Sequence, residues 1–450
     1  MEIPAEYKGK YFYHFTHIEN LDSIVKNGFI CTNEKDKNGI KHKNVAYESI
    51  QHRRSEMDVT CSPHGKVHDY VPFYFATTNP MLLSITNRKN IDQPFLIYFA
   101  ISIEKLLEDN VAFTDASANT IQPPNFYNSG NDLVRLDWSA INKTHWGSID
   151  DNERHKRMAE VLIYKEVPLD WIDTIIVWNK HFKDETIKIF QENGKELPNI
   201  SFSPFKWRHF YFTKFQFDRN NETLVTGPYF LKNLMNRTEK EIFEKRAINA
   251  GVEKRFKNIS DALKVLKDDF CAIPELAGIY ELKTDNRIHT DNVSDHTKQV
   301  VSNLLPNKNK YFDNLTDKDK EIVLLSAYLH DIGKGPKSKW KNGIQYVYPD
   351  HPADGLTMLG RIMIEDFEEL SNDQIKKICL LVGYHDLIGD ILEKDRSTEE
   401  LINLDLNSNE LNMLVALTIA DVTAINFMWA LSINSKLSNF VAELEMKNTL

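Results

Sequence analysis

The sequence predicts an α+β protein in which a region of mixed helices and strands is followed by an all-α helical bundle. At 450 residues the chain is about three times as long as a typical domain, so at least two compact units are expected. Up to about residue 200, short apolar or alternating runs separated by polar turns indicate strands. From about residue 285 onward, long helical patterns replace the strand pattern.

The strongest individual elements follow from these patterns in chain order. Strands are expected at YVPFYFA (70–76), FLIYFAI (95–101), EVLIYKEV (160–167) and TIIVWN (174–179). Helices are expected at EIVLLSAYLHDIG (321–333) and NELNMLVALTIADVTAINFMWAL (409–431). An aromatic-rich patch and a charged helical segment lie between the two regions, and such aromatic density favours burial over a flexible linker. The predicted organisation is a mixed domain (1–200), a connecting module (201–268) and a helical domain (269–450).

Composition excludes several classes of protein. Charged residues make up 27% and hydrophobic residues 42% of the chain, which is too apolar for a disordered protein. The formal net charge of −10 excludes a globally basic nucleic-acid-binding surface, although seven basic and four acidic residues between Lys35 and Lys66 leave room for a local one. Four scattered cysteines, no signal peptide and no apolar run of about 20 residues predict a cytoplasmic protein without a membrane span.

The mixed region contains four candidate site residues on three predicted strands. His14 and Thr16 lie on the first strand, where the alternative for the histidine is a buried structural residue that hydrogen-bonds to a backbone carbonyl. Tyr74 lies on the strand at 70–76, where aromatic core packing is the alternative. Glu160 begins an otherwise apolar strand, and a charge there is costly unless it is paired, at the mouth of the strand, or functional.

Together these residues resemble the pattern by which ADP-ribosyltransferases hold NAD, and the surrounding motifs are similar to those of the DarT family of DNA ADP-ribosyltransferases. The resemblance covers roughly residues 8–200. It implies a fold of split mixed β-sheets with helices, and the transfer of ADP-ribose from NAD to a base in single-stranded DNA, usually by a toxin or phage-defence protein. The motifs are IQHRRSEMDVT (50–60), GKVHDYVPFYFATTNPMLLSI (65–85), AFTDASAN (112–119), FYN (126–128), LDWSAIN (136–142) and ERHKRMAEVLIYKEVPLDWI (153–172).

The resemblance implies a role for each residue. Glu160 would stabilise the positive charge that develops on the ribose as nicotinamide departs. Tyr74 would stack on nicotinamide, while His14 and Thr16 would bind the ribose on the adenosine side. Arg53 or Arg54 would assist at the NAD and nucleobase site, and the sequence does not choose between them. A loop over about 146–158 would present the acceptor base, with thymine and guanine both open.

The helical region contains a separate constellation of histidines and aspartates. The wide spacing of these residues predicts that each comes from a different helix or helix end, as in metal sites within helix bundles. Neutral imidazoles and carboxylates suit manganese, iron, nickel or zinc better than calcium. Any one of these histidines has a structural alternative, but the full set favours a metal site. Its members are His296, His330, Asp331, His351, His385 and Asp421.

This constellation resembles the HD phosphohydrolase superfamily over about residues 270–430. The matching motifs are VSDHTKQVV (293–301), LHDIGKGPKSKWKNGIQYVYPDHPADGLTML (329–359) and LVGYHDL (381–387). The resemblance implies hydrolysis of a phosphorylated small molecule or nucleotide, with Asp331 bridging two ions and His351 and His385 holding the second. Lys334 would contact phosphate, or is simply a solvated lysine.

Three functional hypotheses follow. The first is a bifunctional enzyme that modifies single-stranded DNA with NAD and hydrolyses phosphate esters in its HD domain, with a possible separate antitoxin protein as partner. In the second, the transferase acts on RNA or a nucleotide and the HD domain is a regulatory or ligand-sensing module without turnover. In the third, the HD domain is the effector and the transferase is inactive, although Glu160, Tyr74 and His14 argue against that loss.

Overall fold

The computed structural model describes residues 2–45, 48–119, 122–143, 150–202, 205–206, 208–215, 221–248, 251–285, 292–306 and 309–447. By its internal contacts the chain divides into two compact units. The first comprises residues 1–87 and 91–224, and the second comprises residues 88–90 and 225–450. Each unit encloses a hydrophobic core of its own.

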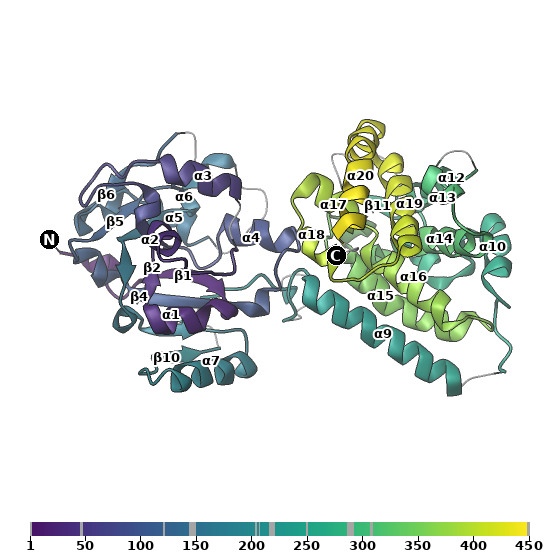
Figure 1. Cartoon of the computed structure of the whole chain (residues 1–450), viewed down its shortest axis with the longest axis horizontal. Helices are drawn as coiled ribbons and strands as arrows, with labels where there is room; N and C mark the ends of the chain where they lie inside the picture. The colour runs from purple at the N-terminus through teal and green to yellow at the C-terminus, as the bar shows by residue number, and fades with distance from the viewer. Residues whose placement is uncertain are drawn as a thin grey trace. The chain divides into compact units, whose positions relative to one another are not determined.

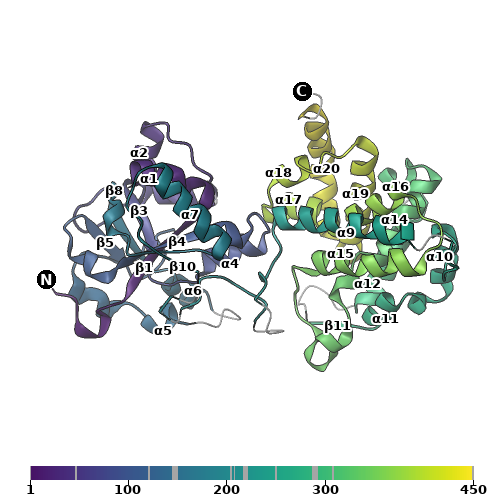
Figure 2. The same cartoon turned by 90° about the horizontal axis from the view of Figure 1, so that it is seen from below.

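The first unit is built on an eight-stranded sheet of order β10-β9-β4-β1-β3-β7-β5-β6, in which β9 and β10 are parallel and the other neighbours antiparallel. A small sheet pairs β2 with β8. Figures 1 and 2 show helices around these sheets. The strands are β1 (Tyr11–His17), β2 (Phe29–Ile30), β3 (Tyr70–Tyr74), β4 (Leu96–Ser102), β5 (Val111–Thr114), β6 (Phe126–Tyr127), β7 (Glu160–Tyr164), β8 (Glu166–Val167), β9 (Thr174–Ile176) and β10 (Asn199–Ser201). The helices are α1 (Leu21–Asn27), α2 (Thr32–Lys37), α3 (Glu48–Glu56), α4 (Pro80–Asn87), α5 (Trp138–Ile141), α6 (Asp151–Arg157) and α7 (Lys180–Glu192).

The centre of the large sheet is where its strands are least continuously paired. β1 pairs with β4 at all seven of its residues, but its register with β3 consists of the pair Tyr13–Tyr74. Beyond that pair a cavity lies between the two strands, lined by His14 and Thr16 from β1 and by residues 70–72 from β3. On its other side β3 pairs with β7, and Tyr74 lies opposite Glu160. The pairing therefore places three of the predicted site positions around one region of the sheet.

Strands form within all four predicted runs, because these runs are rich in β-branched and aromatic residues that the sheet buries. The run at 160–167 is not one strand: Lys165 (φ 63°) separates β7 from β8, and β8 pairs with β2. The run at 174–179 forms a strand over its first three residues. β4 is the clearest case: six of its seven residues are buried, as expected for a strand covered on both faces. The mixed architecture predicted for the first unit is confirmed.

The second unit is a helical bundle, as predicted, with one short parallel pairing of β11 (Lys283–Thr284) and β12 (Ile344–Gln345). The long helix α9 packs against α15 and α16 (Figures 1 and 2). The helices are α9 (Pro228–Ile248), α10 (Ile259–Asp268), α11 (Pro274–Ile279), α12 (Val293–Asn303), α13 (Lys310–Asp313), α14 (Asp317–Leu329), α15 (His351–Arg361), α16 (Asn372–Tyr384), α17 (Leu387–Lys394), α18 (Thr398–Ile402), α19 (Ser408–Ile425) and α20 (Phe427–Lys447).

One predicted helix is divided in two. The pattern at 409–431 continues without interruption, but the structure ends α19 at Ile425 and starts α20 at Phe427. Asn426 between them is extended (φ −158°), and its side-chain oxygen accepts hydrogen bonds from the amides of Met428 (2.9 Å) and Trp429 (3.3 Å). An asparagine that caps the following helix explains the break, because its side chain replaces the missing backbone acceptors.

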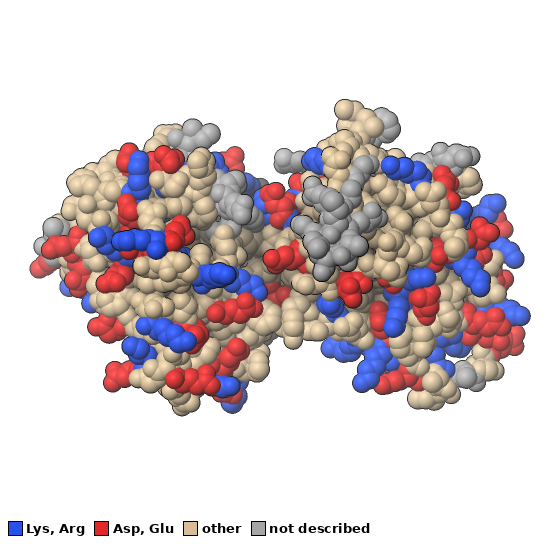
Figure 3. Space-filling model, viewed as in Figure 1, with Lys and Arg blue, Asp and Glu red and all other residues tan. Residues whose placement is uncertain are grey.

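The stretch predicted as a connecting module (201–268) contributes to both units. Phe210 and Phe212 are buried in the first unit, where the Tyr98 hydroxyl donates to the Phe210 carbonyl at 2.7 Å. Residues from 225 onward, including α9 and α10, belong to the second unit. On the face shown in Figure 3, basic and acidic side chains are interspersed over both units. Among the described residues, no helix combines the length and apolar character needed to cross a membrane.

Candidate active sites

Glu160 is completely buried at the start of β7, and its carboxylate is held on both oxygens. The guanidinium of Arg54 donates to Oε1 at 2.9 Å and to Oε2 at 2.8 Å. The backbone amide of Ala118 donates a further hydrogen bond to Oε1 at 2.9 Å. Burial opposes the charge of Arg54, but Glu160 outweighs it and raises the arginine pKa above its ordinary value. The pair is a bidentate, charge-assisted contact that fixes the direction of the carboxylate.

The two candidate arginines have different surroundings, although both lie on α3. Arg54 is 7% exposed and faces Glu160, whereas the neighbouring Arg53 is exposed and lines a large pocket. Successive helix residues point about 100° apart, so one arginine of such a pair faces the core and the other does not. The structure thus separates a buried positioning arginine from a surface arginine.

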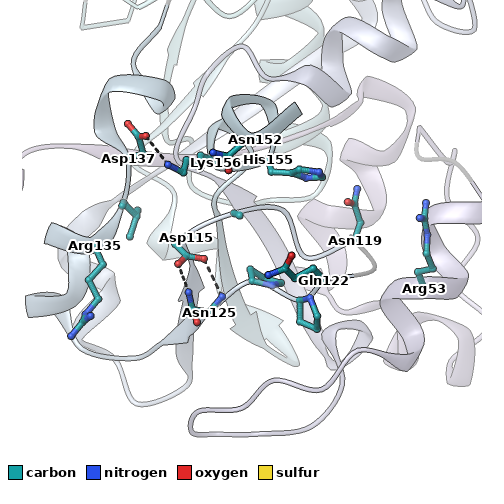
Figure 4. Close-up of a pocket in the computed structure, with 14 residues that line it drawn as sticks. Arg53, Asp115, Asn119, Gln122, Asn125, Arg135, Asp137, Asn152, His155 and Lys156 are labelled. Atoms are coloured by element: carbon teal, nitrogen blue, oxygen red, sulfur yellow. Dashed lines mark hydrogen bonds and ion pairs between the residues drawn. The ribbon is translucent and has the colours of Figure 1, made fainter. Parts of the chain in front are cut away.

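The pocket beside Arg53 has a volume of about 900 Å³ and is lined mainly by polar side chains. Figure 4 shows Arg53 and Asn119 on one side and the Asp137–Lys156 ion pair (3.3 Å) on another. Helix α6, which contributes Lys156, begins at a cap where Asp150 accepts from the amide of Glu153 at 2.7 Å. The other polar lining residues are Asp115, Gln122, Asn125, Arg135, Asn152 and His155.

This pocket adjoins the buried glutamate through one segment of the chain. Ala116 and Asn119 line the pocket, and Ala118 between them donates its amide to Glu160. Of the predicted loop over 146–158, residues 146–149 lie outside the described part of the chain, and the remainder includes α6. The same segment, residues 116–119, therefore lines the pocket and holds Glu160.

His14 and Thr16 line a second, smaller cavity of about 90 Å³ between β1 and β3. The Nδ1 atom of His14 lies 2.7 Å from the carbonyl oxygen of Pro72; since a carbonyl only accepts, Nδ1 carries the proton and Nε2 is a free acceptor. Burial lowers the pKa of His14 to about 4, against the opposing effect of that carbonyl. Thr16 accepts a hydrogen bond from Asn20 at 2.9 Å.

Tyr74 belongs to the Glu160 cluster more than to the small cavity. Its ring stacks on Phe15 with centroids 6.1 Å apart, and its hydroxyl donates to the sulfur of Met81 at 3.2 Å. Burial is the main cause of a raised tyrosine pKa, so the phenol is neutral at physiological pH. The structure therefore arranges the predicted residues in two groups, His14 with Thr16 and Tyr74 with Arg54 and Glu160.

In the second unit, the six predicted metal ligands converge from five segments of the bundle. Two groups share Asp331: His296 and His330 approach its Oδ2 atom, and His351 and His385 approach its Oδ1 atom. His330 and His385 occupy the C-caps of α14 and α16, whereas His351 begins α15. Asp421 of α19 completes the first group, with Oδ1 2.8 Å from His296 Nε2.

Gly333 allows the close approach that this convergence needs. A Cβ at that position would lie 1.9 Å from the carbonyl oxygen of His351 and 2.6 Å from the amide nitrogen of Gly355. Any other residue would separate the turn after Asp331 from the start of α15. Gly333 thus brings the ligands of the two groups to one site.

The ring orientations of three histidines fit a metal centre. His330, His351 and His385 each direct Nδ1 toward the carbonyl oxygen three residues earlier, at 2.8, 2.8 and 2.9 Å. Because these carbonyls fix the proton on Nδ1, the Nε2 lone pairs are available as ligands. The Nε2 atoms of His351 and His385 lie 3.0 Å apart, where two lone pairs repel unless they share a proton or a cation.

Two buried atoms support the same conclusion. Within the described residues, neither Nε2 of His330 nor Oδ1 of Asp331 makes a hydrogen bond, and orphaned buried polar atoms are uncommon. Burial alone would raise the pKa of Asp331. Its neighbours Lys334 and His330 outweigh burial and hold that pKa well below the usual range of a carboxyl group. The site is therefore an anionic oxygen surrounded by imidazole nitrogens.

A bound cation would compete with the positive charges that already lie beside Asp331. Lys334 Nζ lies 2.6 Å from Asp331 Oδ2. Burial lowers the pKa of His351 to about 3, which keeps its imidazole neutral. Burial of His330 is outweighed by Asp331 and Asp421, which raise its pKa to about 9, so metal binding there would release a proton.

Comparison with known proteins identifies the families that the two regions of the chain resemble. Residues 13–212 match the family model described as ssDNA thymidine ADP-ribosyltransferase, DarT, and residues 289–414 match the HD domain model. A DNA ADP-ribosyl transferase of Thermus sp. (strain 2.9) is 32% identical over 186 residues, which cover 40% of this chain and 87% of that protein. The chain belongs to the DarT family.

A second relative and a solved structure are similar to the first unit. A DNA ADP-ribosyl transferase of Thermus aquaticus is 30% identical over 207 residues, covering 45% of this chain and 88% of that protein. The solved structure of Thermus sp. 2.9 DarT in complex with ADP-ribosylated ssDNA is 28% identical, with 46% of this chain and 99% of that chain covered and a TM-score of 0.41. The protein is thus a DarT-type DNA ADP-ribosyltransferase fused to an HD domain.

The structure also reveals contacts that were not predicted. The backbone amide of Ala118 holds the catalytic candidate of the DarT unit, and a sequence pattern carries no signal for such a loop amide. In the HD unit, Asp386 lies near the metal-ligand candidates, and its position directly after His385 was a visible signal. The roles of the predicted site residues stay predictions.

Proposed function

We propose that the DarT unit transfers ADP-ribose from NAD to a base of single-stranded DNA, with Glu160 as the catalytic carboxylate. The observation that carries this proposal is the preorganised carboxylate, held by Arg54 and Ala118 beside a pocket of about 900 Å³. Cleavage of the nicotinamide–ribose bond develops positive charge on the ribose. A fixed negative charge stabilises that transition state without reorganisation during the reaction.

NAD would lie where β1 and β3 separate, with the adenosine-side ribose on His14 and Thr16 and nicotinamide at Tyr74. The neutral imidazole of His14 keeps Nε2 as a hydrogen-bond acceptor for a ribose hydroxyl. The cavity at His14 has about 90 Å³, well below the roughly 300–1,000 Å³ of pockets that enclose a whole ligand. Bound NAD would therefore extend beyond it toward Tyr74 and Glu160.

The acceptor strand would occupy the pocket at Arg53. Amide side chains such as Asn119 and Asn152 offer both donors and acceptors to the edge of an unpaired base, and Arg53 offers a cation to phosphate. Paired bases hide those edges, so single strands are expected to be preferred over duplex. The pocket leaves thymine and guanine both open as acceptors.

The test of this proposal is the variant Glu160→Gln in the full chain. The matched control is Glu166→Gln, at an exposed position of the next strand, β8. Loss of one preorganised electrostatic group costs about 2.7–4 kcal/mol, so the rate of ADP-ribosylation should fall about 10²–10³-fold in the first variant only. Mass spectrometry of single-stranded oligonucleotides incubated with NAD measures the product. An undiminished rate in Glu160→Gln removes this residue from the mechanism.

The alternative acceptor is RNA or a free nucleotide. Incubation of the wild-type chain with labelled NAD and equal concentrations of single-stranded DNA, duplex DNA, RNA or nucleotides separates these possibilities. The proposal expects a mass gain of one ADP-ribose on single-stranded DNA. Preferential labelling of RNA or of a nucleotide would favour the alternative.

For the HD unit we propose a dinuclear phosphohydrolase acting on a phosphorylated small molecule or nucleotide. His296, His330, Asp331 and Asp421 would hold one ion, and Asp331, His351 and His385 the other, with manganese, iron, nickel or zinc as candidates. The ions would supply the Lewis acidity that phosphate ester hydrolysis needs. Lys334, 2.6 Å from Asp331, would offer its ammonium group to the phosphate.

Loading with Mn²⁺ followed by metal analysis tests the HD proposal. The wild-type chain should retain two ions and hydrolyse chromogenic phosphate mono- or diesters, whereas Asp331→Ala should lose metal at both positions because it removes the shared ligand. His351→Ala and His385→Ala should mainly empty the second position. A regulatory HD module, the rival hypothesis, would bind metal and ligand without turnover and would change the transferase rate instead.

The biological setting proposed for this enzyme is that of a cytoplasmic toxin or phage-defence protein with a separate antitoxin partner. A transferase that modifies DNA bases blocks their pairing, so expression of the wild-type chain should arrest growth. The Glu160→Gln variant, expressed at the same level, should not. Equal growth arrest by both variants would dissociate toxicity from DNA modification.

A further inference from the structure

The predicted ligands of the HD unit leave one nearby carboxylate without a role. Asp386 directly follows His385, and its carboxylate lies between the two histidines of the second group: Oδ1 is 3.4 Å from His385 Nε2 and Oδ2 is 3.6 Å from His351 Nε2. These are the same two Nε2 atoms that approach each other to 3.0 Å. Three donor groups therefore face one point.

Asp386 and Asp331, the two carboxylates near this point, differ in their exposure to solvent. The side chain of Asp331 is 1% exposed, and its Oδ1 lies 3.3 Å from His351 Nε2 and 4.0 Å from His385 Nε2. The side chain of Asp386 is 26% exposed, which makes it more open to solvent than any of the six predicted ligands. The second position thus has one carboxylate from the interior and one from the solvent side.

Asp386 has a contact outside the histidine group, since its Oδ2 lies 3.6 Å from Nζ of Lys89, but a helix-capping role for it finds no support. Asp386 occupies the N-cap of α17, where an aspartate commonly accepts a hydrogen bond from a backbone amide of the first turn. Its side chain accepts no such capping bond, and its own backbone is already helical (φ −76°, ψ −20°). The carboxylate is directed toward the histidines instead of the helix end.

We propose that Asp386 is the outer ligand of the second metal ion, in addition to the six residues of the predicted set. This inference rests on the dinuclear centre proposed for the HD unit. Without Asp386, the second position has two imidazoles and one oxygen of Asp331. Three protein ligands are few for a first-row cation, and Asp331 shares its negative charge with the first ion. A second carboxylate brings a negative charge that the first position receives from Asp421.

The proposal also explains the asymmetry between the two positions. The first ion would be enclosed by buried ligands, whereas the second would have its most exposed ligand facing solvent. Substrate and water would therefore reach the centre on the Asp386 side. We expect the second ion to exchange with solution more readily than the first.

The test compares Asp386→Asn and Asp386→Ala with the matched control Asp354→Asn. Asp354 is a carboxylate of similar exposure (28%) on α15, where it accepts from the Tyr348 hydroxyl at 2.7 Å and pairs with Lys339 at 2.6 Å. The full chain of each variant is loaded with Mn²⁺ alone, freed of excess ion and analysed by plasma mass spectrometry. Electron paramagnetic resonance distinguishes coupled from isolated Mn²⁺ independently of any activity.

The wild type and Asp354→Asn should retain two ions per chain and give the spectrum of a coupled pair. Both Asp386 variants should retain one ion and give the spectrum of isolated Mn²⁺, with the affinity for the second ion reduced about 100-fold or more, since loss of an outer-shell partner alone costs about 10–100-fold. Asp386→Glu, which restores the carboxylate, should recover part of that affinity.

Two different results would overturn the inference, one for Asp386 alone and one for the whole dinuclear centre. Two tightly bound, coupled ions in both Asp386→Asn and Asp386→Ala would remove Asp386 from the ligand set while the dinuclear centre stands. One ion or none in the wild type would remove the dinuclear centre itself, and the inference with it. Thermal unfolding of each variant verifies that the bundle is folded, which is expected because Asp386 is partly exposed and caps no helix end.

Discussion

The two units bury their candidate functional carboxylates in opposite ways. Glu160 in the DarT unit is satisfied by the protein itself, since an arginine and a backbone amide occupy both oxygens. Asp331 in the HD unit has one oxygen 2.6 Å from Lys334 and another that makes no hydrogen bond within the described residues, while imidazole nitrogens surround it. Both groups are nearly inaccessible to solvent.

This difference fits the different roles that we propose for the two negative charges. A fully paired carboxylate keeps its orientation and stabilises a charge that appears only in the transition state. A carboxylate among convergent lone pairs is suited to a cation that is present before the reaction begins. Burial alone therefore does not distinguish an electrostatic catalyst from a metal ligand, but the hydrogen-bond partners do.

The largest expected effect follows from breaking the pair in the DarT unit. Arg54→Ala leaves the Glu160 carboxylate buried without its cation, which commonly costs about 3–5 kcal/mol. We expect that loss in the free energy of unfolding of the DarT unit, measured with urea, together with loss of DNA modification. Replacing both residues by apolar ones (Arg54→Met with Glu160→Leu) should recover stability but not activity. A stable, active Arg54→Ala variant would contradict the pairing.

The corresponding experiment on the HD unit is removal of metal. At a metal concentration of 100 times Kd, binding stabilises the folded state by about 2.7 kcal/mol. A chelator should therefore lower the unfolding temperature of the HD unit and abolish phosphate ester hydrolysis, while NAD-dependent labelling of DNA is retained. Calorimetry and the two activity assays measure these outcomes in one sample. Loss of labelling on chelation would contradict the independence of the two chemistries.

A smaller effect is expected for the arginine next to Arg54. Arg53→Ala should leave the free energy of unfolding within about 0.5 kcal/mol of wild type, because Arg53 is exposed. Loss of one charge-assisted contact of about 1.5 kcal/mol should raise KM for single-stranded DNA about tenfold. The slope of the logarithm of DNA affinity against the logarithm of salt concentration should decrease by about one. Lys188→Ala on α7, an exposed cation outside the pocket that pairs with Glu192 at 3.7 Å, is the control. Equal effects of both variants would argue against Arg53 as a DNA contact.

The smallest effect is expected from pH at His14. Because its pKa is lowered from 6.5 to about 4, the folded unit binds fewer protons than the unfolded chain between these values. The contribution of His14 to stability is thus complete above pH 6.5 and declines as pH falls through this window. KM for NAD should change less than about twofold between pH 5.5 and 8. An NMR titration of His14 with a midpoint near 6.5 would contradict the burial described here.

The sequence predicted both sites but not their internal assignments. Glu160 stood out because a lone charge at the head of an apolar strand requires an explanation, and the histidine spacing indicated one metal site in the bundle. The choice between Arg53 and Arg54 depends on which face of α3 meets β7. With the sequence ESIQHRRSE, this helix has no apolar stripe that marks its buried face, so only tertiary packing decides.

Other features escaped prediction for similar reasons. The helical periodicity across Asn426 is uninterrupted, and the break appears only because the asparagine side chain caps α20. The hydrogen bond from Ala118 uses a backbone amide, and because nearly every residue has one, the sequence does not mark this position. Periodicity reports which residues are buried, but it does not report which buried groups face one another.

The narrow contact between β1 and β3 has a mechanical consequence. The sheet consists of two four-stranded leaves, β10-β9-β4-β1 and β3-β7-β5-β6, which join through the register pair Tyr13–Tyr74 and the hydrogen bond from His14 Nδ1 to the Pro72 carbonyl oxygen. β1 forms seven register pairs with β4 and β3 forms five with β7, so the β1–β3 joint is expected to open before either leaf does. We expect deuterium exchange to be fast at this joint in the free protein and slow with dinucleotide present, which would make the sheet itself the element that adapts to the ligand.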